Sequence, residues 1–199
     1  MTHLLPLFLN LTGRLVVLVG GGRVAEAKLR QLAAAGARVR VVAPSIGSQI
    51  RAAGVELIER AFAASDLDDA WFVVAAATPD VNRAVAEAAE ARRIFVNAVD
   101  DPPNATAYLS GVVRRHDVTI AISTSGDAPA LTSLVREALD AVLPRDLDRW
   151  MTVAREQRAA WRSGGVPMHE RKPQLLRALN SMYETHAAGE THERGVESR

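Results

Sequence analysis

One stretch near the start of the chain constrains its fold more than any other. The apolar run "RLVVLV" passes through "GGG" into "RVAEAKLRQLAAA", whose apolar residues recur at helical spacing. A buried strand that turns through glycines into an amphipathic helix is typical of the first half of a β–α–β unit. The stretch therefore predicts a parallel sheet whose first connection carries a tight glycine turn.

Four more apolar strands are expected in the first hundred residues. They follow a first strand at 14–19 and occupy residues 37–43, 55–59, 71–76 and 94–98. A second amphipathic helix begins after Pro79 and separates the last two of them. Near-continuous apolar strands between amphipathic helices indicate a parallel sheet covered on both faces. We therefore predict an α/β fold with a Rossmann-like, doubly wound sheet.

The pattern changes after residue 104. Two β-rich runs at 106–113 and 118–124 flank four polar residues and predict a hairpin. The helix expected next has Asp127 as its N-cap, Pro129 in its first turn and the clearest apolar stripe of the chain. That stripe consists of Leu131, Leu134, Val135, Ala138, Leu139 and Val142.

The remaining residues predict a helical C-terminal region. Helices are expected around 145–162 and 172–186, and the polar residues 187–199 are expected to be disordered. Trp150 and Trp161 lie in the first of these helices, and the sequence assigns them no role. We divide the chain into a Rossmann-like domain (1–104), a hairpin-and-helix region (105–143), a helical region (144–186) and the polar tail.

The amino-acid composition excludes several classes of binding partner. The net charge is +1, so nothing indicates a nucleic-acid or membrane-surface partner. The chain has no Cys, which excludes disulfides and thiolate sites, and its five His lack the spacing of metal ligands. We therefore expect no permanently bound metal. No apolar run approaches the ~20 residues of a membrane span, and the apolar start lacks the basic residues of a signal peptide, so we expect a cytoplasmic protein.

The glycine turn has the pattern of a dinucleotide site. Gly20, Gly22 and Ala25 fit G-x-G-x-x-A, in which small residues let the backbone approach a pyrophosphate at a helix N-terminus. The alternative is a tight turn that binds nothing. The next strand ends without the carboxylate that commonly holds the adenosine ribose, although Ser45 can contact a hydroxyl there. The nearest following Arg is Arg51, in the next helix, so these features favour NAD over NADP.

A pair of carboxylates follows the fifth expected strand. Asp100 comes at the carboxyl edge of the sheet, where ligands of such folds bind, and its carboxylate can accept a proton. The alternative is that Asp100 and Asp101 only cap the turn "DDPP". We assign Asp101 to the turn, and the residues alone leave both roles open for Asp100.

Four motifs together resemble a known family. They are "LPLFLNLTGRLVVLVGGGRVAEAK", "VVAPS", "FVNAVDDP" and "IAISTSGDAPALTSLVREALDAVLP", in order over about residues 4 to 160. They resemble successive motifs of the precorrin-2 dehydrogenases, the NAD-dependent enzymes of sirohaem synthesis, some of which are also sirohydrochlorin ferrochelatases. The resemblance implies a Rossmann-like domain, a small β dimerisation element and a C-terminal helical region. It also implies an interlocked homodimer with its site in a cleft between the cofactor and the partner subunit.

The resemblance also implies roles for particular residues. The catalytic carboxylate of the family falls on Asp100. The cofactor contacts fall on Gly22, Arg23, Val24, Pro44, Ser45, Thr78 and Asn97, beside Gly20 and Ala25 of the glycine pattern. The substrate, precorrin-2, carries eight carboxylates and calls for cations and hydroxyls. The candidates are Arg114, Arg115 and His116 in the hairpin turn and Ser123, Thr124, Ser125 and Gly126 before the next helix. The alternatives for these groups are a solvated polar loop and ordinary helix capping.

The chain departs from the family pattern after Asp100. The family commonly has an aromatic residue followed by Pro, whereas "TAYLSG" places Ala107 and Ser110 there, with Tyr108 displaced by one. No methyltransferase module is expected, so the chain is not expected to make precorrin-2. Two further hypotheses remain open: a non-catalytic NAD-sensing regulatory domain, and a chelatase alone, with Fe2+ as its substrate.

Overall fold

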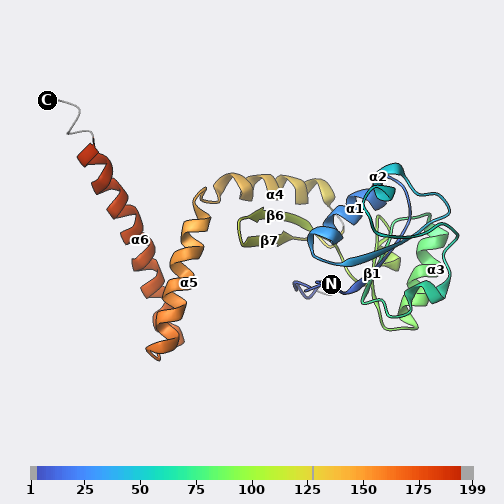
Figure 1. The fold of residues 1–199 in the computed structure, drawn as a ribbon, viewed down its shortest axis with the longest axis horizontal. Coiled ribbons are helices and arrows are strands. Elements are labelled where there is room, and N and C mark those ends of the chain that lie inside the picture. The colour runs from blue at the N-terminus through green and yellow to red at the C-terminus, as the bar shows by residue number, and fades with distance from the viewer. Residues whose placement is uncertain (1–3, 127, 194–199) are drawn as a thin grey trace. The chain divides into compact units, whose positions relative to one another are not determined.

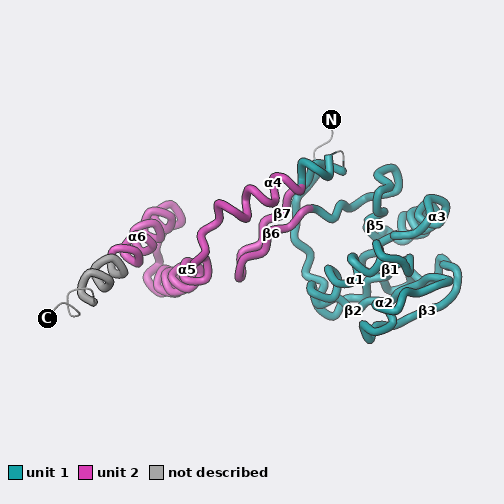
Figure 2. Tube along the Cα trace, turned by 90° about the horizontal axis from the view of Figure 1, so that it is seen from above, with its two compact units in different colours: residues 1–110, 123–132 teal, residues 111–122, 133–199 magenta. Residues whose placement is uncertain are grey.

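The computed structural model describes residues 4–126 and 128–193, and side chains are considered only up to residue 184. The chain forms two compact units (Figure 2): residues 1–110 with 123–132, and residues 111–122 with 133–199. Asp127, the expected N-cap, lies outside the described residues.

The first unit is built on a five-stranded parallel sheet in the order β3-β2-β1-β4-β5. The strands are β1 (Leu15–Val19), β2 (Arg38–Val42), β3 (Glu56–Ile58), β4 (Phe72–Ala75) and β5 (Phe95–Ala98). Between them lie α1 (Arg23–Ala34), α2 (Ser48–Arg51), the 3-10 turn η1 (Ala64–Leu67) and α3 (Pro79–Glu90), and the 3-10 turn η2 (Pro102–Asn104) follows β5 (Figure 1). The predicted doubly wound sheet is confirmed, and each strand expected within this sheet lies within one residue of the observed bounds.

The sheet is buried on both faces, which explains its continuous apolar strands. All five residues of β1 are buried. Ala25, Leu29 and Leu32 of α1 pack on one face, and Val85 and Ala89 of α3 pack on the other. Strand order reverses between β1 and β4, and ligands of doubly wound sheets bind at the carboxyl ends of the strands at such a point.

Asp66 is a buried carboxylate that ties η1 to the loop before it. It is 4% exposed and accepts hydrogen bonds from Arg60 Nη1 and from the Ala63 backbone N–H, each at 2.8 Å to Oδ2. The hydrogen bond from Arg60 is the largest of the causes that hold the pKa of Asp66 below its ordinary value.

This lowered pKa predicts an acid-dependent stability. A carboxylate whose pKa is lower in the folded state stabilises the fold above its unfolded-state pKa and stops doing so as the pH falls through its folded value. Asp66→Asn should therefore cost about 1–3 kcal/mol at neutral pH and flatten the loss of stability below about pH 4. Urea unfolding at several pH values measures this, with Glu87→Gln, on the exposed face of α3, as the control. Equal pH slopes for Asp66→Asn and the parent protein would contradict it.

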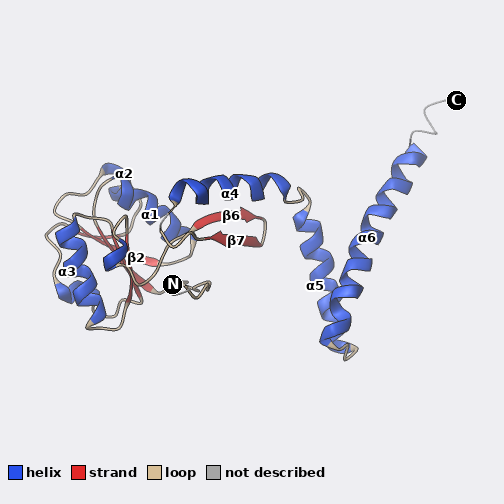
Figure 3. Ribbon diagram, turned by 180° about the vertical axis from the view of Figure 1, so that it is seen from behind, coloured by secondary structure: helices blue, strands red, loops and turns tan. Residues whose placement is uncertain are grey.

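The second unit contains the predicted hairpin and the C-terminal helices (Figure 3). Strands β6 (Gly111–Arg115) and β7 (Val118–Ile122) pair antiparallel, and the unit ends in α5 (Leu147–Ser163) and α6 (Met168–Glu193). Helix α4 (Pro129–Val142) begins in the first unit and continues in the second. No helix within the described ranges is long and apolar enough to cross a membrane.

Helix α6 differs from its predicted extent at both ends. It begins at Met168 rather than at residue 172, so Pro173 lies inside it. It also continues to Glu193, into the tail that we expected to be disordered, where Ala and Glu favour a helix. The prediction of disorder was based on the polar composition of the tail, which does not take the helix propensity of Ala and Glu into account.

The two tryptophans of α5 connect it to α6. Trp161 is buried and donates from Nε1 to Gln174 Oε1 at 2.7 Å. Trp150 donates from Nε1 to the Tyr183 hydroxyl at 2.6 Å. Both indoles therefore hold this helix pair together, a role the sequence did not assign.

Candidate functional site

Two of the three glycines pack the turn tightly against the ends of neighbouring strands. Gly20 has a φ of +133°, and a Cβ there would lie 2.3 Å from the carbonyl oxygen of Ala76. A Cβ on Gly21 would lie 1.9 Å from the carbonyl oxygen of Ser45. Neither position can hold a larger residue without a backbone shift. Gly21 is outside the G-x-G-x-x-A pattern, and only the unbroken run "GGG" in the sequence hints at its role.

Gly22 is different because nothing near it requires a glycine. It is exposed, its backbone is extended, and a Cβ there would meet no atom within 4 Å. It is the N-cap of α1, yet among the described residues no side chain caps the first-turn N–H groups. Free N–H groups at a helix N-terminus beside open space fit the pyrophosphate of a dinucleotide.

The residues that follow Gly22 divide between surface and core. Arg23 is exposed and Val24 is 47% exposed at the start of α1. Ala25 is fully buried against the sheet, so its small size serves helix-to-sheet packing.

Pro44 and Ser45 form an exposed loop after β2, next to the glycine turn. Arg51 lies at the end of α2, but its guanidinium is engaged: Nε donates to the Ile46 carbonyl at 3.1 Å and Nη1 donates to Glu59 Oε2 at 3.0 Å. The same pairing raises the pKa of Arg51 and lowers the pKa of Glu59. The nearest cation that follows this loop in the sequence is therefore paired with a carboxylate.

Thr78 follows β4, and Asn97 is the penultimate residue of β5. Both therefore lie at the same edge of the sheet. Thr78 is exposed and is the N-cap residue of α3. Asn97 is 6% exposed, and its Nδ2 donates to the Ala107 carbonyl at 3.0 Å. Its Oδ1 has no hydrogen-bond partner among the described residues. A buried acceptor of this kind is available to an N–H donor.

The two carboxylates after β5 differ in their contacts. Both Asp101 oxygens accept from Asn104 Nδ2 at 3.0 Å, and Asp101 is the N-cap of η2. Asp100 is exposed in the left-handed region, with a φ of +54°, which Asp tolerates better than most residues. Within the described part of the chain its carboxylate accepts no hydrogen bond. The structure thus gives Asp101 to the turn and leaves Asp100 free.

The hairpin cations are only partly available, and Arg114 and Arg115 lie in strand β6, not in the turn as expected. Arg115 donates to the Leu143 carbonyl at 2.6 Å and to Asp140 Oδ1 at 2.9 Å, so it caps the C-terminal end of α4. His116 Nε2 lies 3.8 Å from an Asp148 carboxylate oxygen. Arg114 is exposed and makes no hydrogen bond or ion pair with any described residue. Of the three, Arg114 best suits a role toward substrate.

The segment before α4 largely satisfies its own hydrogen bonds. Thr124 Oγ1 lies 2.9 Å from Thr132 Oγ1 and accepts from the Ala128 N–H at 3.3 Å. Ser123 Oγ accepts from the Ser125 N–H at 3.1 Å. These contacts favour local capping for Ser123 and Thr124.

Ser125 and Gly126 remain exposed in this segment, in left-handed conformations with φ of +57° and +88°. A Cβ on Gly126 would lie 3.7 Å from the Tyr108 ring. The displaced aromatic residue of the family pattern therefore lies beside this loop.

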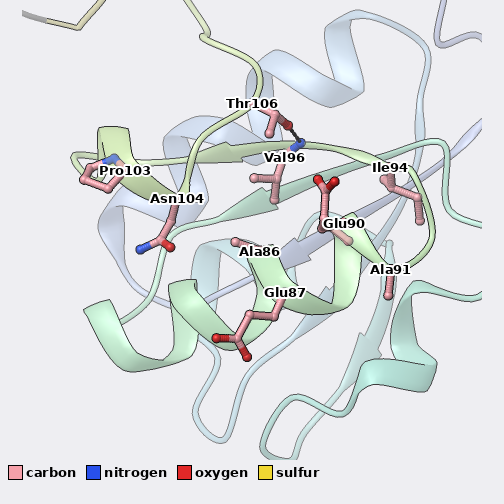
Figure 4. Close-up of a pocket in the computed structure, with 10 residues that line it drawn as sticks. Ala86, Glu87, Glu90, Ala91, Ile94, Val96, Pro103, Asn104 and Thr106 are labelled. Carbon is pink, nitrogen blue, oxygen red and sulfur yellow. Dashed lines mark hydrogen bonds between the residues drawn. The ribbon is translucent and has the colours of Figure 1, made fainter.

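A separate depression of about 540 Å³ lies between α3, β5 and η2 (Figure 4). Its lining includes Glu87, Glu90, Ile94, Val96 and Asn104, and none of the predicted site residues. No group of three or more His, Cys, Asp or Glu within the described ranges could hold a metal ion. The candidate site is therefore the sheet edge that carries the glycine turn and Asp100.

Similar proteins share the sequence and the fold. The chain is 41% identical over 177 residues to "Siroheme synthase 2" of Cronobacter sakazakii and 41% identical over 177 residues to the siroheme synthase of Citrobacter koseri. Both alignments cover 86% of this chain but 38% of the relative, so the chain spans about two fifths of the relatives' length. A solved structure, "SirC, precorrin-2 dehydrogenase", matches with a TM-score of 0.69 and 24% identity, covering 87% of this chain and 88% of that one. At this identity, the match shows a common fold.

A family model for NAD(P)-binding domains (NAD_binding_7) matches residues 7–111. This stretch contains the whole parallel sheet, the open glycine turn and Asp100. The match agrees with the uncapped N-terminus of α1 and the open space at Gly22. The chain belongs to this family of NAD(P)-binding domains.

Proposed function

We propose that the chain is a dehydrogenase that oxidises precorrin-2 to sirohydrochlorin with NAD in sirohaem synthesis. The observation that carries the proposal is the free carboxylate of Asp100 at the sheet edge that also bears the open glycine turn. The names of the relatives, siroheme synthases and SirC precorrin-2 dehydrogenase, support this substrate.

In the proposed mechanism, the residues at this edge of the sheet have separate roles in binding the cofactor and in proton transfer. Bound NAD supplies the acceptor for the hydride that leaves precorrin-2. Gly20 and Gly22 shape the turn, and the first-turn N–H groups at Arg23 and Val24 bind the pyrophosphate. Pro44 and Ser45 contact the adenosine ribose.

The rest of the proposed site lies at the ends of β4 and β5. Thr78 and Asn97 border the nicotinamide end, where the buried Oδ1 of Asn97 can accept an N–H. Asp100 accepts the proton that precorrin-2 loses when the hydride departs. With NAD as the hydride acceptor, the oxidation would balance when the Asp100 carboxylate takes the second proton.

Anaerobic incubation with precorrin-2 and NAD tests the function. We expect NADH and the sirohydrochlorin spectrum to rise together in equal amounts. A protein that binds NAD but forms no NADH would contradict the proposal and favour an NAD-sensing domain. A parallel sample with Fe2+ tests the second activity, in which iron is the substrate and the sirohaem spectrum is the readout.

We predict a preference for NAD over NADP. The 2′-phosphate of NADP needs a cation near Ser45, and Arg51 is already paired with Glu59. The ratio kcat/KM should be at least about tenfold higher with NAD, a difference of about 1.4 kcal/mol. Glu59→Gln, which releases Arg51, should improve use of NADP and leave use of NAD unchanged. Equal kcat/KM values for the two cofactors with the parent protein would overturn this prediction.

We also propose a homodimer, because much of the clearest apolar stripe of the sequence stays exposed. In α4, Leu134 is 63% exposed and Val142 is 74% exposed, and no residue of this helix is buried among those described. Exposed apolar surface of this kind marks an interface. Light scattering at micromolar concentration should show a dimer, which Leu134→Asp should weaken and Glu137→Gln, on the same helix, should not. A monomeric parent protein would refute the proposal.

A further inference from the structure

Lys28 is a half-buried cation on α1 that the proposed mechanism does not use. It lies between Ala25 and Leu29, both buried against the sheet, so its stem leaves the helix beside this apolar contact. It makes no hydrogen bond or ion pair with any residue in the described ranges. A partly buried ammonium with three unused donors is a favourable partner for an anion.

Lys28 lies on a helix that packs against the same core as the segment carrying Asp100. Val99 and Ala107, on either side of Asp100 in the chain, pack against the same core cluster as Ala25 and Leu29. Partial burial lowers the pKa of Lys28, and the charge of Asp100 opposes this effect. The two charges are therefore close enough to interact, although they form no direct ion pair.

We infer that Lys28 binds a carboxylate of the tetrapyrrole substrate beside Asp100. The inference rests on the proposed function, in which a substrate with eight carboxylates must approach the Asp100 carboxylate. Like charges repel there, and the Lys28 ammonium offsets the repulsion. Partial burial strengthens this effect, because charges interact more strongly where less water screens them. Lys28 is thus a substrate-binding residue. It lies outside the glycine pattern, and although it is the last residue of the first family motif, the resemblance gives it no role.

The chain offers a matched control for this role. Of its 24 basic residues 22 are Arg, and the other two are Lys28 and Lys172, which is exposed on α6. Lys28→Met removes the charge and keeps the apolar stem, Lys28→Arg keeps the charge, and Lys172→Met makes the same change elsewhere. The probe is uroporphyrin I, a stable porphyrin with eight carboxylates, whose binding to the full chain is followed by fluorescence titration.

Lys28→Met should raise the Kd for uroporphyrin I by about tenfold, because a charged hydrogen bond is lost. Lys28→Arg should restore most of the affinity, and Lys172→Met should not change it. The Kd for NAD should be the same in all four proteins. Added salt should weaken porphyrin binding more in the parent protein than in Lys28→Met, and the melting temperature of each variant reports its folding.

Several results would overturn the inference. They are an unchanged porphyrin Kd in Lys28→Met, an equal loss in Lys172→Met, an equal loss of NAD affinity, and no binding of uroporphyrin I by the parent protein. If Lys28→Met does not fold, Lys28→Gln with the same salt series replaces it. A protein that binds uroporphyrin I through Lys28 but forms no NADH from precorrin-2 contradicts the proposed function alone. NADH formation with Lys28-independent porphyrin binding contradicts this inference alone.

Discussion

Asp100→Asn should slow the oxidation of precorrin-2 by about 10²- to 10⁴-fold, the usual effect of losing a general base. Asn is the better first substitution because Asp100 has a φ of +54°, and Asn adopts this left-handed conformation more readily than Ala. The affinity for NAD should be nearly unchanged, because Asp100 is not part of the glycine turn. Single-turnover kinetics and a separate NAD titration measure the two effects.

Asp101→Ala is the matched control for Asp100. This substitution removes the hydrogen bonds that Asn104 Nδ2 donates to the carboxylate and should lower stability slightly. Its kcat should stay close to that of the parent protein. The opposite order of effects in kcat would make Asp100 structural and place the base elsewhere. Small losses at both positions would mean that the proton leaves to water and that the site contributes orientation alone.

Gly22→Asp should separate cofactor binding from stability. Asp is a favoured N-cap residue, and Gly22 already has the extended backbone of a cap with open space around it, so the melting temperature should not fall. The new carboxylate would stand where the pyrophosphate binds, and we expect NAD affinity to drop on the order of 100-fold. Calorimetric titration with NAD and thermal unfolding measure the two results.

Gly21→Ala, one residue earlier, should give the reverse pattern. Its Cβ would lie 1.9 Å from the Ser45 carbonyl oxygen, so the loop after β2 must shift. We expect a loss of about 1–3 kcal/mol in stability, as for other overpacked sites. NAD affinity measured well below the melting temperature should fall less than in Gly22→Asp. If Gly22→Asp binds NAD as tightly as the parent protein, the glycine turn is not the pyrophosphate site.

The glycine pattern was a partial guide to the site. It identified Gly20, Gly22 and Ala25, but their roles differ. Gly20 has a backbone conformation that favours glycine, Gly22 leaves open space at the start of α1, and Ala25 packs against the sheet. It passed over Gly21, because the constraint there comes from the Ser45 carbonyl, which belongs to the next β–α connection.

The sequence by itself determined the parallel sheet, its helices and the place of Asp100 directly after the last strand of that sheet. These features follow from the spacing of apolar residues and from turn-forming residues. Both depend on residues that are close together in the sequence.

Only the tertiary structure decided which charged side chains remain free to bind a ligand. Arg115 is engaged by Asp140, 25 residues away, and Arg51 by Glu59, while Lys28 stays unpaired among the described residues and near Asp100. The physical reason is that an ion pair depends on distances between segments that folding brings together, and the spacing of residues along the chain does not contain those distances.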